Sequence, residues 1–336
     1  MYRDHTVGVV VPAYNEEGKV SRVVETMPPT VDRVYIVDDA STDDTWSEIT
    51  DAVAAVRARE DGEMTAAFDQ RWVPIQHEEN TGVGGAILTG YRRALKDGID
   101  ATAVMAGDAQ MDPDVLPRLL DPIVEEEAEY VKASRLLRRE DWRGMPPFRL
   151  FGNLLLTGLT RISSGYWRMT DPQNGYTVIS ERALREVDLD TLYEDYGFAN
   201  DLLVRLNAAG LPIADVETPS EFFYDDEEWD SHIDLKTFVP RTSMLLLRNF
   251  LWRLRRDGGA ARVFLALYAV GVVGVALAVG TLLSGVVEAG PGDPLDGTGS
   301  GAGELLLAGI VALLLGLAVD VGSNAGLLTR VYAGDD

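Results

Sequence analysis

The sequence predicts an α/β protein: a mainly parallel β-sheet flanked by helices, followed by a C-terminal pair of membrane-spanning helices. Three observations lead to this prediction. Short apolar runs of strand length alternate with helical patterns over residues 1–230, as in chains built from β-α-β units. Polar side chains directly follow the first four of these runs. Two long apolar segments then fill most of the chain after residue 260.

The alternation can be followed element by element. The expected strands are Thr6–Pro12, Arg33–Val37, Trp72–Gln76, Ala101–Met105 and Tyr130–Ala133. The expected helices are Asn15–Met27, Asp43–Arg59, Gly82–Lys96 and Pro113–Glu127. Parallel sheets of this kind bind their ligands beyond the carboxyl ends of the strands. The residues directly after each strand are therefore the candidates for a functional site.

The two apolar segments predict a transmembrane hairpin. Val263–Val287 contains no charged residue and is long enough to cross a bilayer. Leu305–Leu328 is interrupted only by Asp320 and Asn324, and the polar turn PGDPLDGTGSG lies between the two segments. A pair of buried helices in a soluble domain is the alternative. A carboxylate inside a span is costly, so we expect Asp320 to have a partner or water, or to mark the end of its span.

The flanking charges predict the orientation of the hairpin. Arg residues precede the first span in RNFLWRLRR and at Arg262, and Arg330 follows the second span, whereas the connecting loop is acidic. The positive-inside tendency then places the N-terminal part and the C-terminus in the cytoplasm. Leu235–Arg256 mixes Leu, Phe and Trp with Arg, so it is either a helix in the lipid headgroup layer or a core helix. The expected organisation is a catalytic domain at 1–234, a juxtamembrane amphipathic helix at 235–260, and a hairpin at 261–336 with spans near 263–287 and 305–328.

The composition excludes several classes of function. The formal net charge is -24, so no nucleic-acid partner is expected, because binding a phosphate backbone needs clustered Lys and Arg. The chain has no Cys, and its three His are far apart, so any metal should be a hard ion such as Mg or Mn held by oxygen. An acidic surface with few Lys is typical of proteins that stay soluble in high salt, although ordinary acidity is the alternative.

Polar residues after the first two strands are suited to a nucleotide. Tyr14 can cover a base or a sugar ring, and Glu16 can accept a hydrogen bond from a base or a ribose. Asn15 with two acids after it is also good helix-capping chemistry, so a structural role stays open. Asp38 and Asp39 end the second strand before the capping position, where a carboxylate can accept from a nucleobase edge.

The third and fourth strands are followed by groups suited to phosphate and metal. Gly84 and Gly85, within Asn80–Ala86, allow close approach of a ligand and leave N–H groups free at a helix start, where anions are favoured. After the fourth strand, Asp108 and Gln110 are oxygen donors of the kind that a divalent ion bridging two phosphates prefers. A solvated turn is the alternative for this segment.

These segments together resemble one family. PAYNE, VDDASTDDT, NTGVGGA and GDAQMDP occur in the order and at the spacing of the inverting family 2 glycosyltransferases, which have a GT-A fold. More narrowly, the sequence resembles the dolichyl-phosphate and polyprenyl-phosphate mannose and glucose synthases over about residues 6–235. Ala133–Arg135 is similar to the G-S-R segment of these enzymes, Asp171–Tyr176 to their D-x-Q-S-G-Y/F loop, and Phe198–Asp201 to their F-E-x-E/D helix start. No Q-x-x-R-W occurs, which disfavours a processive polysaccharide synthase.

The resemblance implies roles for single residues. The nucleotide-sugar ligands would be Pro12, Ala13, Tyr14, Glu16, Val37, Asp38, Asp39, Asn80, Gly84, Gly85, Asp108, Arg135 and His232. The metal ligands would be Asp108 and Gln110, and the catalytic residues Asp108, Asp171 and Arg135. Ala106 stands where the family has the first Asp of D-x-D-x-Q, so we expect weaker metal binding or a ligand supplied by water or diphosphate. The late basic pair of the family has no match except that His232 falls near its Lys.

The implied activity is transfer of a hexose from UDP-glucose or GDP-mannose to dolichyl or polyprenyl phosphate, in the synthesis of lipid-linked glycans for protein N-glycosylation. A lipid phosphate is already anionic and needs little help from a general base, and its tail explains the membrane hairpin. Arg135, Arg138, Arg139 and Arg143 are the cations expected near it, unless they form a solvated loop face. Two alternatives stay open: transfer to a hydroxyl of a lipid-linked glycan, with Asp171 or Asp201 as base, and an inactive nucleotide-binding membrane scaffold.

Overall fold

The structure, a computed structural model, describes residues 1–59, 68–137, 147–218, 235–256, 259–288 and 298–332. The chain divides into two compact units. We call Met1–Asn249 with Gly326–Asp336 the sheet unit, and Phe250–Ala325 the hairpin unit.

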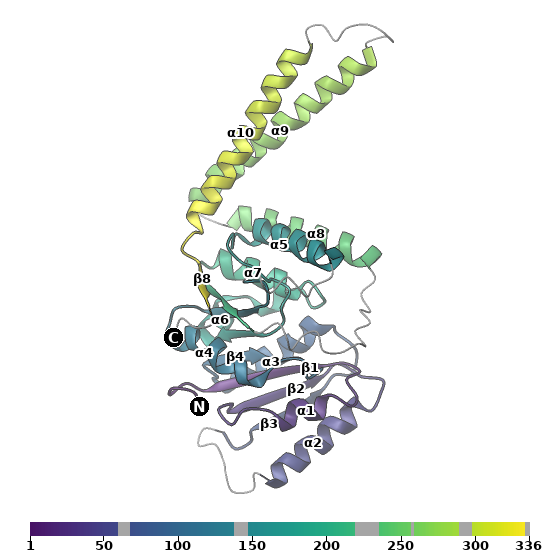
Figure 1. The fold of residues 1–336 in the computed structure, drawn as a ribbon, viewed down its shortest axis with the longest axis vertical. Helices are drawn as coiled ribbons and strands as arrows, with labels where there is room; N and C mark the ends of the chain where they lie inside the picture. The colour runs from purple at the N-terminus through teal and green to yellow at the C-terminus, as the bar shows by residue number, and fades with distance from the viewer. Residues whose placement is uncertain (60–67, 138–146, 219–234, 257–258, 289–297, 333–336) are drawn as a thin grey trace. The chain divides into compact units, whose positions relative to one another are not determined.

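The sheet unit is built on an eight-stranded sheet with the strand order β3-β2-β1-β4-β6-β5-β7-β8. Figure 1 labels β1 to β4 and β8 of this sheet. The strands are β1 (Val7–Ala13), β2 (Arg33–Asp38), β3 (Trp72–Gln76), β4 (Ala101–Val104), β5 (Tyr130–Ser134), β6 (Thr177–Ser180), β7 (Ile213–Glu217) and β8 (Leu328–Val331). Only β6 runs antiparallel to its neighbours, β4 and β5. The predicted mainly parallel sheet is therefore confirmed, and the five predicted strands are β1 to β5.

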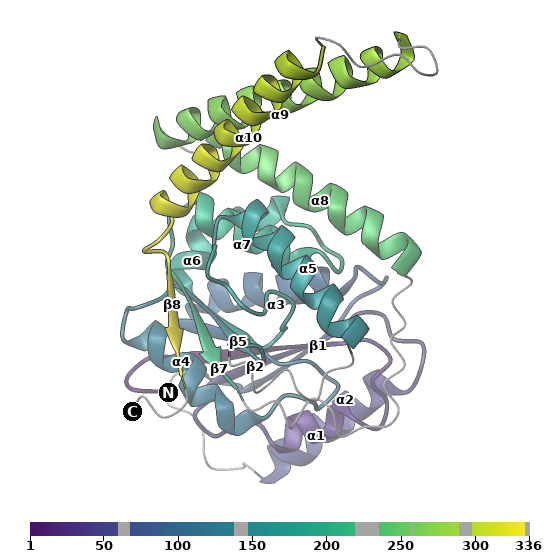
Figure 2. The ribbon, with the colours of Figure 1, turned by 45° about the horizontal axis from the view of Figure 1, so that its top comes forward.

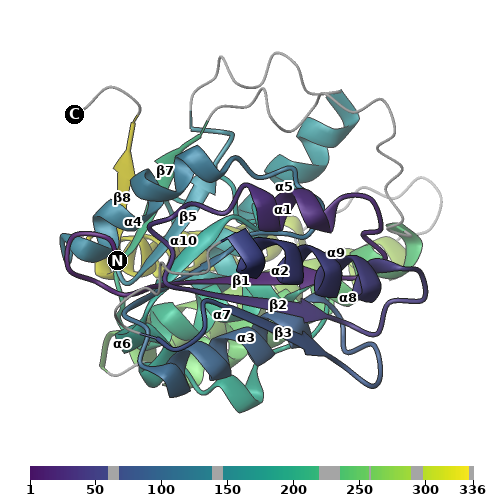
Figure 3. The same cartoon turned by 90° about the horizontal axis from the view of Figure 1, so that it is seen from below.

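Helices cover both faces of this sheet, because alternate residues of each strand point to opposite sides. Val9 and Val11 of β1 pack into a core with α1 (Val20–Glu25), α2 (Thr45–Arg59) and α4 (Leu116–Val124). Val10 packs into the core on the other face, with α3 (Val83–Asp97), α6 (Glu181–Glu186) and α7 (Phe198–Ala208). Figure 3 shows the sheet edge-on between α1 and α2 on one side and α3 and α6 on the other. The remaining helices of this unit are η1 (Pro113–Val115), α5 (Pro147–Ser164), η3 (Leu189–Thr191) and most of α8 (Leu235–Arg256).

The first helix is shorter than the sequence predicts. The expected helix Asn15–Met27 is replaced by a loop up to Lys19 and by α1. Asn15 has φ 55° and Gly18 has φ 80°, so two left-handed residues interrupt the helical path. The expected helix Pro113–Glu127 is likewise shorter, since it is made of η1 and α4.

The hairpin unit contains α9 (Gly259–Glu288) and α10 (Thr298–Ser323). Val263–Ser284 and Gly301–Ser323 are each long and apolar enough to cross a membrane, and only 17% and 22% of an apolar 18-residue stretch in each are buried in the structure. The two helices approach closely at glycines, because a Cβ atom on Gly309 would lie 2.9 Å from the carbonyl oxygen of Gly271. The low burial leaves most of this apolar surface without a protein partner.

The chain after α10 differs from the prediction. The second span was expected to reach Leu328, but α10 ends at Ser323 and Leu328–Val331 is β8. Asn324 donates from its backbone N–H and its side chain to the carbonyl oxygen of Asp320, which closes the helix. β8 then pairs in parallel with β7, beside which it lies at the sheet edge in Figure 2. β8, which the sequence analysis placed in the hairpin domain of 261–336, therefore belongs to the sheet unit.

α8 has one buried and one exposed apolar face. Leu245 and Leu246 are buried, and Leu245 lies so close to Gly197 that a Cβ atom there would clash with it. Met244 and Leu247 are 66% and 51% exposed. The sequence left open whether this segment is a core helix or a helix in the lipid headgroup layer. One face of α8 packs on the sheet unit as a core helix would, whereas Met244 and Leu247 on the other face are exposed.

Candidate active site

The loop after β1 is held against the loop after β2. Asn15 Oδ1 accepts a hydrogen bond from Thr42 N at 2.8 Å, and Glu16 N donates to Thr45 Oγ1 at 2.8 Å. Asn15 is therefore not the cap of α1, as the sequence allowed. Its hydrogen bonds instead join the loop after β1 to the loop after β2. Tyr14, which precedes Asn15, is 45% exposed at the edge of the site.

Asp38 and Asp39 are buried at the end of β2 and join the chain after β2 to the chain at the end of β3. Asp38 accepts from Ser41 and from Gln76 Nε2, the latter at 3.2 Å. Asp39 Oδ1 accepts from Thr81 N at 2.9 Å and from Thr81 Oγ1 at 2.8 Å, and it lies 2.7 Å from His77 Nδ1. These contacts hold the chain after β3 against the end of β2. At least one oxygen of each carboxylate is therefore used within the protein.

His77 and Thr81 are members of this site that the sequence did not single out. His77 follows β3 directly and is bonded through Nε2 to Thr89 of α3, at 2.9 Å. The only sequence signal was its place after a strand end. Asn80, which was expected to bind the donor, caps its own turn by accepting from Gly82 N at 3.0 Å.

The glycines at the start of α3 pack against backbone. Gly85 N donates to the carbonyl oxygen of Glu194 at 2.9 Å. A Cβ atom on Gly84 would lie 2.6 Å from the same oxygen, and one on Gly85 would lie 2.3 Å from Thr81 Oγ1. Both glycines are thus needed for close packing, and the N–H group of Gly85 is used within the protein; binding of a phosphate at this loop stays a prediction.

The ends of β1, β2 and β4 meet at Pro12 and Ala13. Asp39 N donates to the Ala13 carbonyl at 2.9 Å, and Gly107 N donates to the Pro12 carbonyl at 3.0 Å. Val37, also expected at the site, is fully buried and lies opposite Pro12 in the sheet register. Tyr14, Asp39 and Asp108 therefore extend from adjoining segments at one edge of the sheet, rather than from separate surfaces.

Charges gather where β1 and β4 end. Burial raises the pKa of Asp108, and nearby Lys19 opposes this effect. Burial also raises the pKa of Glu16, which Lys19 lowers and Asp108 raises further. Lys19 Nζ lies 3.1 Å from Glu16 Oε2. Two carboxylates and one cation leave an excess of negative charge here, which favours an added positive charge.

The donor set at Asp108 fits a hard divalent ion with few protein ligands. Asp108 Oδ1 accepts from Gln110 N at 3.0 Å, across Ala109 in the left-handed conformation. The described residues contain no cluster of three or more acidic, His or Cys side chains that could enclose a metal, and Ala106 supplies no ligand. Mg is usually held by one or two carboxylates together with substrate phosphates and water. Asp108 and Gln110 therefore suit an ion that is bound with a diphosphate.

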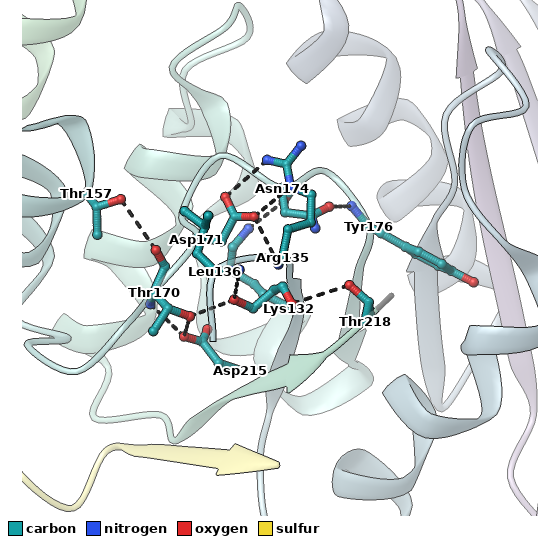
Figure 4. Close-up of polar contacts among 11 residues, drawn as sticks. Lys132, Arg135, Leu136, Thr157, Thr170, Asp171, Asn174, Tyr176, Asp215 and Thr218 are labelled. Carbon is teal, nitrogen blue, oxygen red and sulfur yellow. Dashed lines mark hydrogen bonds and ion pairs between the residues drawn. The ribbon is translucent and has the colours of Figure 1, made fainter. Parts of the chain in front are cut away.

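A second part of the site lies at the end of β5. Arg135 forms a two-pronged ion pair with Asp171, with Nε 2.8 Å from Oδ2 and Nη2 3.2 Å from Oδ1 (Figure 4). The Arg135 backbone N also donates to Asp171 Oδ2, at 3.3 Å. Asp201, the other candidate base, is fully buried in α7 and accepts from Tyr193 N at 3.0 Å. His232 and the cations Arg138, Arg139 and Arg143 lie outside the described residues.

Comparisons with known proteins agree with this geometry. The profile of Glycosyl transferase family 2 matches residues 8–188, more than half of the chain. UDP-N-acetylglucosamine–dolichyl-phosphate N-acetylglucosaminyltransferase of Methanococcus voltae is 30% identical over 64% of this chain and 87% of its own length. The low-salt glycan biosynthesis hexosyltransferase Agl6 of Haloferax volcanii is 27% identical over 95% of this chain and 69% of its own. Dolichol-phosphate mannosyltransferase of Pyrococcus furiosus is 25% identical over 73% of this chain and 71% of its own length.

Solved structures support the fold. Glucosyl-3-phosphoglycerate synthase of Mycobacterium tuberculosis, in complex with phosphoglyceric acid, superposes with a TM-score of 0.51 at 19% identity over 74% of this chain and 80% of its own. The same enzyme with Mn²⁺, UDP and glucosyl-3-phosphoglycerate gives 0.50 at 18% identity and the same coverage. At these identities the likeness shows the GT-A-type fold alone. With the profile match over residues 8–188, it establishes that the chain belongs to glycosyl transferase family 2.

Proposed function

We propose that this protein is a membrane-anchored, metal-dependent inverting glycosyltransferase that moves a hexose from a nucleoside diphosphate sugar to dolichyl or polyprenyl phosphate, in the synthesis of lipid-linked glycans. The donor would be UDP-glucose or GDP-mannose. One observation carries the proposal: the polar ends of β1, β2 and β4 meet at Pro12 and Ala13, which brings Tyr14, Asp39 and Asp108 to one edge of the sheet. The names of the relatives from Methanococcus and Pyrococcus support the lipid-phosphate acceptor. The name of the Haloferax relative supports transfer of a hexose in glycan synthesis.

On the donor side, each residue has a distinct task. Tyr14 is exposed enough to stack on the base, and Glu16 lies near Asp108, where the sugar-bearing diphosphate would enter. Asp108 and Gln110 would hold Mg or Mn. When bound, the ion would neutralise the charge that develops on the departing diphosphate. Asp38 and Asp39 hold the chain after β2 against the chain at the end of β3 and thereby shape the base-binding side.

On the acceptor side, the ion pair favours a phosphate over a hydroxyl. A hydroxyl acceptor would need a base, and Asp171 would have to leave Arg135 to serve as one. Asp201 is buried and accepts a backbone hydrogen bond, so it is not placed to receive a proton from an acceptor. A lipid phosphate needs no such base, and Arg135 at the edge of the pair supplies a cation for it.

Apolar surface supports contact with a membrane. α9 and α10 would span the bilayer, with the sheet unit in the cytoplasm as the Arg-rich flanks indicate. Within the sheet unit, Leu155 of α5 is 54% exposed and Met244 of α8 is 66% exposed. Exposed apolar residues on these helices suit the lipid surface from which a long polyprenyl chain would be drawn.

The test is transfer by the purified full-length chain in detergent or liposomes. It would be given radiolabelled UDP- and GDP-hexoses, dolichyl phosphate, and Mg, Mn or EDTA. We expect a radiolabelled lipid with one donor, dependent on the metal and absent with Asp108→Asn. No labelled lipid under any combination, while nucleotide still binds, would favour the inactive scaffold; label on a lipid-linked glycan alone would favour the hydroxyl acceptor.

A further inference from the structure

Two oppositely charged side chains lie inside the sheet, behind the Arg135–Asp171 pair. Lys132 of β5 and Asp215 of β7 are both fully buried, and they face each other in the parallel register of the two strands. Moving a charge from water into a protein interior is costly, and an apolar pair of similar volume often gives equal or greater stability. Their position in the core therefore calls for an explanation other than stability.

The two side chains hold opposite ends of the same turn. Lys132 Nζ donates to the Asn174 carbonyl at 2.7 Å. Asp215 Oδ2 accepts from both the backbone N and Oγ1 of Thr170, each at 2.7 Å. Asp171 lies one residue after Thr170, and its carbonyl oxygen accepts from Asn174 N. The turn that carries Asp171 is therefore fixed at both ends from the sheet beneath it, as Figure 4 shows.

A third contact links the turn to the strand that carries Arg135. Ser134 Oγ lies 2.7 Å from Thr170 Oγ1, so Thr170 is bonded to both β5 and β7. Arg135 is the next residue after Ser134. Any shift of Thr170 would thus change the distance between Asp171 and Arg135.

From this geometry we infer that Lys132 and Asp215 are positioning residues, which hold the turn Thr170–Asn174 so that Arg135 is presented to the phosphate of the acceptor. The inference rests on the proposed function. Neither side chain touches the substrate. Their effect on transfer passes through the Thr170 and Asn174 contacts, and it should appear in the acceptor kinetics rather than in nucleotide binding.

The pH dependence separates positioning from a purely structural role. Burial lowers the pKa of Lys132 from 10.5 to about 8, an effect that Asp171 and Asp215 oppose and Arg135 adds to; the Tyr130 ring also faces the ammonium group. As pH rises through this value, Lys132 loses its charge in the folded protein. The unfolded chain then binds more protons, so the contribution of Lys132 to stability rises with pH. If Lys132 positions the turn, turnover with the acceptor should fall as the pH rises from about 8 toward 10.5, the interval in which Lys132 loses its charge in the folded protein.

The experiment compares Lys132→Met and Thr170→Val with the wild type, all as full-length protein. We expect the KM for the lipid phosphate to rise about tenfold or more for Lys132→Met, and less for Thr170→Val, with the Kd of the nucleotide changed by less than about twofold. The fall in turnover of the wild type above about pH 8 should be absent in Lys132→Met. Thr170→Val keeps both buried charges, so it remains informative if Lys132→Met does not fold.

The matched control is Asp32→Asn, another fully buried carboxylate, which accepts from Val7 N at 2.8 Å and precedes β2 at the opposite end of the strands. It should lower Tm and leave the acceptor KM unchanged. Folded Lys132→Met or Thr170→Val enzyme with wild-type acceptor KM would overturn the inference. A wild-type protein that transfers no sugar would instead contradict the proposed function, so the two failures can be told apart.

Discussion

Arg135 holds both carboxylate oxygens of Asp171, with its Nε 2.8 Å from Oδ2 and its Nη2 3.2 Å from Oδ1. The Asp171 side chain is 2% exposed and that of Arg135 is 13% exposed, so the pair is largely removed from water. A two-pronged pair of this kind fixes the plane of the guanidinium as well as its position. Asp171 therefore sets the orientation of the Arg135 guanidinium.

The first prediction concerns the loss of one partner of this pair. Arg135→Met leaves the Asp171 carboxylate buried without its cation, so we expect the free energy of unfolding to fall by about 3 kcal/mol and transfer to stop. Arg135→Met with Asp171→Leu removes the isolated charge and should recover most of the stability but no activity. Urea unfolding followed by tryptophan fluorescence measures the difference. If the single variant were as stable as the double variant, the pair would not be a buried, coupled one.

The second prediction concerns Asp108 and pH. Burial raises the pKa of Asp108, so the folded protein binds the carboxyl proton of Asp108 more tightly than the unfolded chain does. Stability therefore decreases as the pH rises from the pKa of Asp108 in the unfolded chain to its pKa in the folded protein. The Asp108→Asn variant has no carboxyl group to titrate at this position, so it does not lose this stability as the pH rises. Without metal at neutral pH, the variant should therefore unfold at or above the Tm of the wild type, although transfer is abolished.

Thermal melts in EDTA from about pH 4 to about pH 8 test this prediction. The wild type should gain stability relative to Asp108→Asn as the pH falls, and addition of Mn with nucleotide should stabilise only the wild type. An Asp108→Asn protein that is stabilised by Mn as strongly as the wild type would show that the ion is held elsewhere.

Much of the fold could be predicted because local patterns agree with it. β1 to β5 are apolar runs of strand length, and their neighbours in the sequence are helices. β8 was missed because its first residue falls in the apolar run expected to be the second span, and β6 because it is an antiparallel strand that the β-α-β alternation does not predict. β7 carries Asp215 in its centre, which breaks the apolar pattern by which strands are recognised.

The site was predictable at the level of strand ends and not at the level of contacts. Asp108 and Gln110 were singled out because they follow a buried strand directly, and their role as metal ligands stays a prediction. The roles of His77 and Thr81 depend on Asp39, which is distant in the sequence, so no local pattern announces them. The close packing of Gly84 and Gly85 against Glu194 and Thr81 was not predicted, because a glycine needed for packing and one needed for a ligand look the same in a sequence.

The third prediction concerns the packing of α9 against α10. Since a Cβ atom on Gly309 would lie 2.9 Å from both Gly271 O and Val275 N, Gly309→Leu should force the helices apart and destabilise the hairpin by about 1–3 kcal/mol. Gly303→Leu is the matched control, because Gly303 lies in the same helix with nothing within 4 Å of its Cβ position. Thermal unfolding in detergent measures both. Equal Tm values for the two variants would argue against close packing at Gly309.

The last prediction concerns the charge inside the second apolar helix. Asp320 was expected to need a partner, and the structure confirms one: Arg253 Nη1 lies 2.9 Å from Oδ1 and Nη2 lies 2.8 Å from Oδ2, with both side chains fully buried. Asp320→Ala leaves the guanidinium in an apolar setting, so we expect a loss of about 3 kcal/mol, whereas Arg253→Leu with Asp320→Leu should lose much less. The variants are compared as full-length chains in detergent, and the measurements are the Tm of thermal unfolding and the resistance of the hairpin to protease. If Asp320→Ala were no less stable than the double variant, water would have to solvate Arg253, and this end of α10 would then lie outside the apolar part of the membrane.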